Sequence, residues 1–234
     1  MHRLCNKYIL AVMAFAICLP MLLLTDIPQR DVAFRYAPMI QAFADFDWAL
    51  AFHPRIPMFH PVVGGIIALV TGVDAYVAAQ LASTLFFALA ILPLFSLMKR
   101  VFDDTTAVVS CFLYTLSPQL LRYASSGMRD SAKSLVFILA VYALVVIFQE
   151  RKSFRGYLWM GLACALMMLT RGDCVMYAFC FMVCMLVFEL MLKKFPWKSI
   201  LSGFLLLVVI TPSLLINMKM TGYPVTEARF AVIM

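Results

Sequence analysis

The sequence predicts an all-α membrane protein, a polytopic bundle of about seven transmembrane helices. Hydrophobic residues make up 65% of the 234-residue chain and charged residues only 13%, whereas soluble domains average roughly 45–50% apolar and 25% charged residues. The charged residues also stand in short clusters between apolar runs of membrane length. We interpret the net charge of +7 as basic residues that flank membrane spans, so nucleic acid is not predicted as a partner.

Seven apolar segments are long enough, with their flanking residues, to approach the roughly 20 residues that a span needs. The predicted spans are residues 8–24, 75–98, 105–121, 131–149, 156–171, 174–192 and 199–216. The fourth to sixth have short apolar cores, so they borrow flanking residues at their ends. The first segment has no A-x-A cleavage site, and we therefore interpret it as a retained span.

The loop between the first two spans, residues 25–74, begins with an amphipathic segment. After Asp31, apolar residues recur at Tyr36, Ile40 and Phe43, and this spacing places them on one face of a helix. We predict that this helix lies along the membrane surface and holds its charged beginning near the headgroups.

The same loop contains a second apolar stretch, PVVGGIIALVTG, at residues 61–72. At 1.5 Å per residue it would extend only about 18 Å, against a hydrocarbon core of roughly 30 Å. It is therefore predicted to be a re-entrant or interfacial helix in the outer leaflet, with His53 and His60 at its mouth.

Basic clusters set the predicted orientation of the chain. With seven crossings, one side receives Arg3 and Lys7, Lys99 and Arg100, Arg151, Lys152 and Arg155, and Lys193, Lys194 and Lys198. This side is cytoplasmic by the positive-inside rule. The expectation is a multi-pass protein of the plasma (inner) membrane with a cytoplasmic amino terminus.

Every predicted outer loop brings carboxylates and cations together. These residues are Asp26, Arg30 and Asp31 in the first loop, Arg122, Arg129, Asp130 and Lys133 in the second, Arg171 and Asp173 in the third, and Lys219, Glu227 and Arg229 in the fourth. Membrane anchoring by snorkelling explains any single cation, and a helix N-cap is the alternative explanation for Asp31. Anchoring does not explain why carboxylates gather on this face. Cations recognise phosphate, and a carboxylate can accept the proton of an acceptor hydroxyl.

Five short segments, in order, carry a resemblance to a known family. They are RD…Y…DW…HP.IP (30–57), QLAS…ILPLFSLMKRVF (80–102), MRDSAKSLVFILAVYAL (128–144), GLACALMMLTRGD (161–173) and TPSLLINMKMTGYPV (211–225). This order resembles the amino-terminal module of GT-C glycosyltransferases, in particular the family 39-like group of protein O-mannosyltransferases and lipid A aminoarabinose transferases. The resemblance implies transfer of a sugar, a hexose or a pentose, from a polyprenyl-phosphate donor. The acceptor would be a glycan, a lipid or a protein at the non-cytoplasmic face, and transfer would invert the sugar's configuration.

The resemblance and the phosphate chemistry together imply roles for individual residues. Asp31 is the expected catalytic carboxylate, Arg129, Lys133 and Arg171 the donor phosphate-binding cations, and Asp130, Asp173, Tyr36 and His53 supporting residues. A divalent cation could bridge Asp31 or Asp130 to the phosphate, although no ligand spacing requires one. The family usually has Asp four residues before the Tyr, whereas Asp31 precedes Tyr36 by five, and Asp173 stands where the family has Glu.

Relatives of this kind usually continue through further spans and often a soluble domain. The expectation is therefore that residues 1–234 are a single seven-span GT-C-like module without the carboxy-terminal module, which a second chain could supply. A transporter or flippase for a lipid-linked anion is an alternative function. Carriers tend to place ionisable residues inside their spans, and the seven apolar cores contain none of Asp, Glu, Lys or Arg. A non-catalytic membrane subunit is a further alternative.

Overall fold

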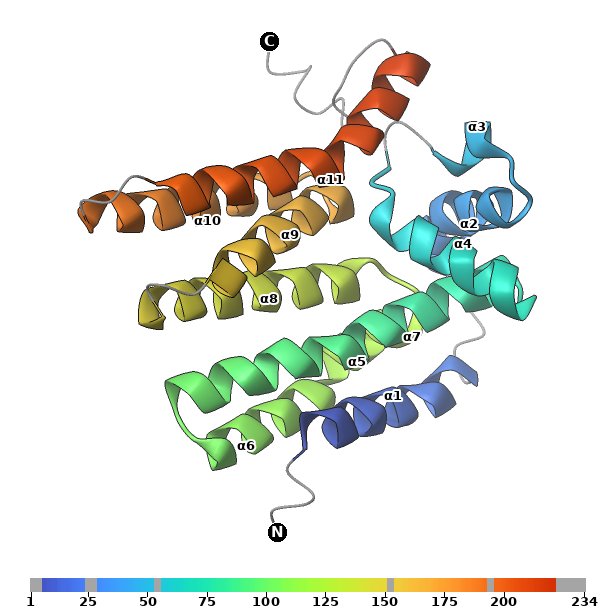
Figure 1. Ribbon diagram of the computed structural model, residues 1–234. Helices are drawn as coiled ribbons and strands as arrows, with labels where there is room; N and C mark the ends of the chain where they lie inside the picture. The colour runs from blue at the N-terminus through green and yellow to red at the C-terminus, as the bar shows by residue number, and fades with distance from the viewer. Residues whose placement is uncertain (1–5, 24–28, 53–55, 151–153, 193–195, 222–234) are drawn as a thin grey trace. The chain divides into compact units, whose positions relative to one another are not determined.

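A computed structural model describes residues 6–23, 29–52, 56–150, 154–192 and 196–221. These residues form eleven α-helices and one π-helical turn without any strand, which confirms the predicted all-α helix bundle (Figure 1). Among them, four helices are long and apolar enough to cross a membrane: Ala75–Val101, Asp130–Gln149, Cys174–Met191 and Trp197–Ile216. The protein is therefore an integral membrane protein, and seven crossings stay a prediction.

The helices group into two compact units, Met1–Ala51 with His60–Ile138, and Phe52–Phe59 with Leu139–Met234. The first unit contains, in order, α1 (Lys7–Leu23), the π-turn η1 (Val32–Tyr36), α2 (Ala37–Ala44), α3 (Trp48–Ala51), α4 (Phe59–Thr71 from its second residue), α5 (Ala75–Val101), α6 (Asp104–Thr115), α7 (Pro118–Ser125) and the start of α8 (Asp130–Gln149). The second unit contains the rest of α8 together with α9 (Phe154–Thr170), α10 (Cys174–Met191) and α11 (Trp197–Thr221).

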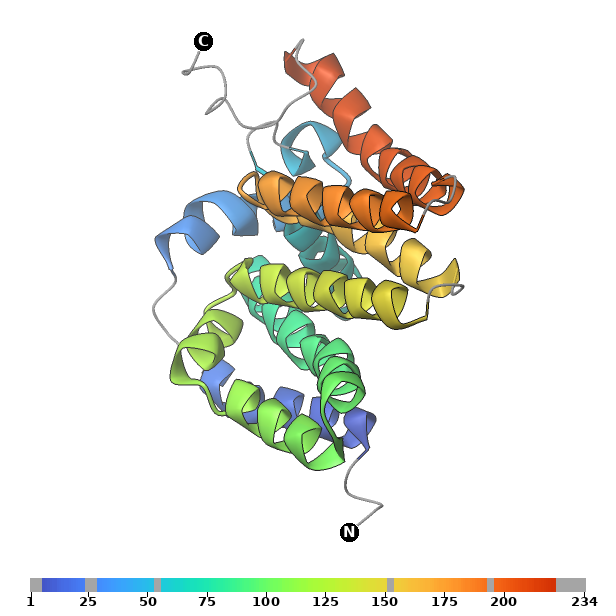
Figure 2. The same cartoon turned by 90° about the vertical axis from the view of Figure 1, so that its left-hand side faces the viewer.

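The long helix α5 organises the first unit, because it packs against α1, α2, α6 and α7 (Figures 1 and 2). Its side chains Phe87 and Ile91 form a buried cluster with Ala14 and Cys18 of α1 and Cys111 of α6. Small residues at such contacts allow helices to approach closely, which is the usual basis of helix association in membranes. The core of the first unit thus combines small and large apolar side chains from α1, α5 and α6.

The single span predicted over residues 105–121 is wrong in its local form, because two helices occupy this stretch. The helix α6 ends at Thr115 and α7 begins at Pro118. Proline has no N–H to donate and pushes the residue before it out of the helical region, and Ser117 accordingly has an extended backbone (φ −64°, ψ 115°).

The amphipathic segment of the first loop packs against α4. A Cβ atom added at Gly64 would lie 2.6 Å from Cδ1 of Ile40, and one at Gly65 would lie 2.5 Å from Cδ1 of Phe43. The two glycines therefore let α2 and α4 approach more closely than any side chain would allow. The predicted apolar stripe thus has a protein partner, and α4 begins two residues before the predicted stretch.

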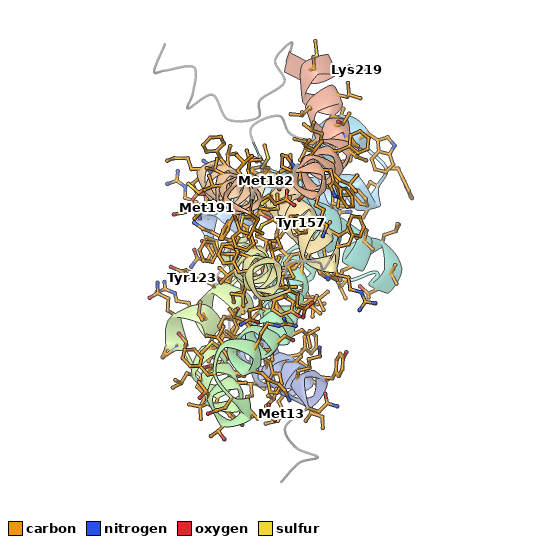
Figure 3. All side chains as sticks on the ribbon, turned by 60° about the vertical axis from the view of Figure 1, so that its left-hand side comes forward. Met13, Tyr123, Tyr157, Met182, Met191 and Lys219 are labelled. Atoms are coloured by element: carbon orange, nitrogen blue, oxygen red, sulfur yellow. The ribbon has the colours of Figure 1, made fainter. Side chains whose placement is uncertain are left out.

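In the second unit, α9 packs against both α10 and α11 (Figure 1). A Cβ atom at Gly161 would lie 2.6 Å from the carbonyl oxygen of Ser202, so glycine sets the close contact between α9 and α11. Tyr157 of α9, labelled in Figure 3, is 2% exposed. The buried carboxylate of Glu189 near the end of α10 accepts hydrogen bonds from the backbone N–H of Ser199 (3.2 Å) and from its hydroxyl.

We expect that Glu189→Ala destabilises this unit by on the order of 1–3 kcal/mol. The carboxylate caps an N–H of the first turn of α11, and its loss also leaves a buried hydroxyl without an acceptor. Glu189→Gln keeps an oxygen acceptor and should retain most of the stability. Thermal unfolding in detergent measures the effect, with exposed Glu150→Ala as the matched control. Equal stability of Glu189→Ala and Glu150→Ala would contradict this role of Glu189.

Candidate functional site

Asp31 does not cap a helix, so the capping alternative is wrong. Its backbone is helical (φ −65°, ψ −34°) and its side chain makes no capping hydrogen bond. The helical turn already includes the preceding residues, since the N–H of Ala33 donates to the carbonyl of Gln29. The carboxylate forms an ion pair with Arg35 at 3.4 Å, in which about half of each side chain is exposed. Asp31 is therefore accessible from outside the protein.

A π-helical turn, Val32–Tyr36, directly follows Asp31 and ends at Tyr36. Hydrogen bonds in such a turn join residue i to residue i+5, and short π segments within helices often occur at functional sites. Residues five apart in a π-turn are related much as residues four apart are related in an α-helix. The π-turn therefore absorbs the extra residue between Asp31 and Tyr36, the spacing in which this chain departs from the pattern that the resemblance implies.

Tyr36 connects the first predicted outer loop to the second. Its ring is 2% exposed, and the guanidinium carbon of Arg129 lies 5.8 Å from the ring centroid. This distance is within the range of a cation–π interaction, which weakens as the cation moves off the ring face. Asp31 and Tyr36 belong to one sequence motif and Arg129 to another; all three lie in the first unit, and Tyr36 and Arg129 are in contact.

The turn before α8 presents Arg129, and side chains of α5 hold this turn. The amide of Gln80 donates to the carbonyl of Ser125 (2.9 Å), and the hydroxyl of Ser83 donates to the carbonyl of Met128 (2.9 Å). Gly127 has φ +75°, a left-handed conformation that favours glycine. An added Cβ atom would also come 3.3 Å from the backbone of α5.

Asp130 and Lys133 stand in the first turn of α8, directly after Arg129. Both side chains are partly buried, and the N–H of Lys133 donates to the carbonyl of Arg129 (3.1 Å). An acidic residue in the first turn of a helix interacts favourably with the helix dipole. Lys133 lies one helical turn beyond Arg129, so the two cations can act on the same anion.

Arg171 and Asp173 form an ion pair between α9 and α10, with 2.9 Å between Nε and Oδ1. They belong to the second unit, whereas Asp31, Tyr36, Arg129, Asp130 and Lys133 belong to the first. Their proposed place in the same site stays a prediction. His53 lies outside the described residues.

His60 was not among the predicted site residues, and it does not lie at an open mouth. It is 1% exposed, its ring centroid lies 5.5 Å from that of Tyr36, and its Nε2 lies 2.8 Å from the hydroxyl of Ser83. A usable sequence signal existed, because polar residues inside apolar membrane segments usually have a specific partner. Gln80 and Ser83 stand inside the predicted span 75–98, and His60 stands directly before the apolar stretch 61–72.

Burial lowers the pKa of His60 from 6.5 to about 4; the carbonyl of Ala79 raises it and the charge of Arg129 lowers it further. The unfolded chain therefore binds a proton near pH 6.5, whereas the folded protein resists protonation until about pH 4. We expect stability to be highest above pH 6.5 and to fall as the pH decreases through this window. His60→Gln, which cannot titrate, should flatten the fall. Unfolding midpoints measured from pH 7.5 to 4 test this, and an equal slope in both proteins would contradict it.

Within the described ranges, no group of three or more His, Cys, Asp or Glu residues is placed to hold a metal ion. The predicted site residues of the first unit include two cations, Arg129 and Lys133, and two carboxylates, Asp31 and Asp130. The two cations, four residues apart, suit an anionic ligand such as a phosphate.

The fold defines a class, a polytopic membrane protein whose charged motif residues stand at helix ends and in loops. The family model for dolichyl-phosphate-mannose-protein mannosyltransferases matches residues 53–216, most of the chain, and the protein belongs to this family. It is therefore a membrane glycosyltransferase of the GT-C type, which confirms the resemblance. The match includes Arg129, Lys133 and Arg171, while Asp31 and Tyr36 precede it. No curated protein and no solved structure matches the chain.

Proposed function

We propose that the protein transfers a hexose or pentose from a polyprenyl-phosphate donor to an acceptor hydroxyl at the non-cytoplasmic face of the inner membrane. The observation that carries this proposal is the contact of Arg129 with Tyr36, which brings a cation of the second motif loop to the loop that bears Asp31. The chain's membership of a glycosyltransferase family supports the reaction type.

The proposed reaction is a single displacement with inversion. The acceptor oxygen attacks the anomeric carbon of the sugar while the bond from this carbon to the phosphate oxygen breaks. Asp31 takes the proton of the acceptor hydroxyl, and polyprenyl phosphate leaves with the bonding electrons. General-base catalysis of this kind contributes roughly 10²–10⁴-fold.

Cations act on the leaving phosphate in this proposal. Arg129 and Lys133 bind the donor phosphate and stabilise the negative charge that grows on it as the bond breaks. Arg171 is a third phosphate ligand, oriented by Asp173, while Asp130 and His53 support the site. The polyprenyl tail stays among membrane lipids beside the spans, so that only the phosphate and sugar reach the interface.

The acceptor in this proposal is a glycan, a lipid or a protein, and a second chain is a candidate partner for completing the acceptor side. The amino terminus is cytoplasmic in this arrangement. The outer loops 25–74 and 116–130 then face the compartment in which the acceptor is found.

A transfer assay tests the proposed function. Membranes containing the protein are given polyprenyl phosphates that carry labelled hexoses or pentoses, and both released polyprenyl phosphate and labelled acceptor are measured. We expect the two products to appear in equal amounts. A flippase would move the intact donor between leaflets without breaking its sugar–phosphate bond. Donor translocation without cleavage, with every donor offered, would therefore contradict the proposal.

A further inference from the structure

We propose that His60 is a positioning residue, which holds Ser83 and, through it, the carbonyl of Met128, and so fixes the turn that presents Arg129. The part of this inference that concerns the donor rests on the proposed function, because there Arg129 binds the donor phosphate. The part that concerns the turn depends only on contacts within the first unit.

The hydrogen bonds of Ser83 determine which nitrogen of His60 carries the proton. A serine hydroxyl has one hydrogen, and that of Ser83 donates to the carbonyl of Met128 at 2.9 Å, an oxygen that can only accept. The contact of 2.8 Å between the hydroxyl and Nε2 of His60 must therefore use the hydrogen of the imidazole. His60 therefore donates from Nε2 to the hydroxyl of Ser83, and this hydroxyl donates in turn to the carbonyl of Met128.

Burial explains why the histidine stays neutral, because it disfavours the charged ring. Nδ1 is buried and makes no hydrogen bond. The groups around the ring are Tyr36 of η1, Phe86, Ser83 and the carbonyl of Ala79 from α5, and the cation Arg129. The Ala79 carbonyl favours the charged ring less than burial disfavours it, and none of the other groups is an anion. The donor role of Nε2 is therefore constant at neutral pH.

The relay supplies hydrogen bonds that the turn lacks. Carbonyl groups at the end of a helix have no partner within it; Ser125 is the last residue of α7, and Met128 stands three residues after it. Gln80 and Ser83 of α5 satisfy these two carbonyls, one on each side of Gly127. Because the peptide unit is planar, fixing the carbonyl of Met128 also fixes the N–H side of Arg129.

His60 thus affects the position of Arg129 through two contacts, one with the ring of Tyr36 and one with the hydroxyl of Ser83. Its ring packs 5.5 Å from that of Tyr36, over which the guanidinium lies. Through Ser83, it also holds the backbone immediately before Arg129. A residue that never meets the donor can in this way set the position of the cation that does.

Hydrogen–deuterium exchange of residues 126–130 tests the turn itself in the full-length protein. We expect Ser83→Ala and His60→Leu to speed exchange here by about fivefold, the factor for one lost hydrogen bond of typical strength. His60→Gln keeps an N–H donor and should restore slow exchange. Ser96→Ala is the matched control, since it removes a hydroxyl from the same helix that bonds only to α5's own Leu92 carbonyl. Unchanged exchange in both Ser83→Ala and His60→Leu would overturn the inference.

Binding of polyprenyl phosphate without sugar tests the link to Arg129. Ser83→Ala should weaken binding by about fivefold in the wild-type background and cause no further loss when Arg129→Ala is already present. Such non-additivity is the mark of residues that act through one another, and His60→Gln should again retain affinity. Equal losses in both backgrounds would show that Ser83 acts independently of Arg129, and would overturn the inference.

The exchange and binding measurements test the turn and the phosphate site independently of each other. If Arg129→Ala leaves the affinity for polyprenyl phosphate unchanged, the proposed phosphate site is wrong, and the positioning of Arg129 for the donor is wrong with it. Exchange at 126–130 then still decides whether His60 and Ser83 hold the turn. If instead Arg129→Ala weakens binding and Ser83→Ala does not, the proposed function stands and the positioning inference is wrong.

Discussion

Replacing Asp31 by Asn is expected to reduce sugar transfer at least about a hundredfold while the protein folds normally. The substitution removes the proposed base and preserves the size of the side chain. Folding should be unaffected, because the structural interaction that the carboxylate makes is an exposed i,i+4 ion pair with Arg35, and such pairs contribute only about 0.3–0.5 kcal/mol. Initial rates of transfer from the labelled donor measure the effect.

Two control variants separate catalysis from the ion pair. Arg35→Gln breaks the same ion pair but leaves the carboxylate of Asp31 in place, so it should retain transfer. Asp45→Asn makes the same chemical change at an exposed residue further along the loop, where the carboxylate accepts from Gln41. If the role of Asp31 were structural, Asp31→Asn and Arg35→Gln would have similar effects. Full transfer by the Asn variant would exclude Asp31 as the base.

The fold class could be predicted because it depends on composition and apolar periodicity, which are averaged over the length of whole helices. The predicted span 75–98 corresponds to α5, and 199–216 lies within α11, since the apolar run and the charged residues beside it decide where each helix continues. The break between α6 and α7 was missed, although Pro118 is visible in the sequence. Averaging hydropathy over a span hides one proline, whereas the hydrogen bonds of the backbone depend on it locally.

The site could be predicted in part, and the limit has a physical cause. Tyr36 and Arg129 were chosen from separate motifs, and the structure brings them into contact. Sequence spacing suggested a shifted register between Asp31 and Tyr36, because spacing assumes α-helical geometry and the chain forms a π-turn there. His60 and Ser83 are 23 residues apart, and neither is one of the charged residues of the predicted outer loops. A buried hydrogen bond between two apolar segments leaves no periodic signal in either one.

Arg129→Ala is expected to reduce the rate of transfer by about 10²–10³, the usual effect of removing one group that stabilises charge in the transition state. The guanidinium is held over the ring of Tyr36, close to the turn that α5 fixes, so little ordering should be needed when the phosphate binds. Affinity for polyprenyl phosphate should fall as well, because the product carries the same anion. Arg129→Lys should recover part of both effects, since lysine keeps the charge and loses the two-pronged geometry.

The matched control is Arg122→Ala, which removes an exposed arginine from α7 in the same loop. If Arg129 contributed only to the positive charge of this face, Arg129→Ala and Arg122→Ala would both weaken the attraction of an anionic lipid. High salt would then remove the difference between each variant and the wild type. A specific phosphate ligand predicts a large loss for Arg129→Ala alone, which persists at high salt because the guanidinium is partly buried against an aromatic ring. Equal rates for Arg129→Ala and Arg122→Ala would show that Arg129 contributes only to the surface charge, and the catalytic contribution assigned to it would then be wrong.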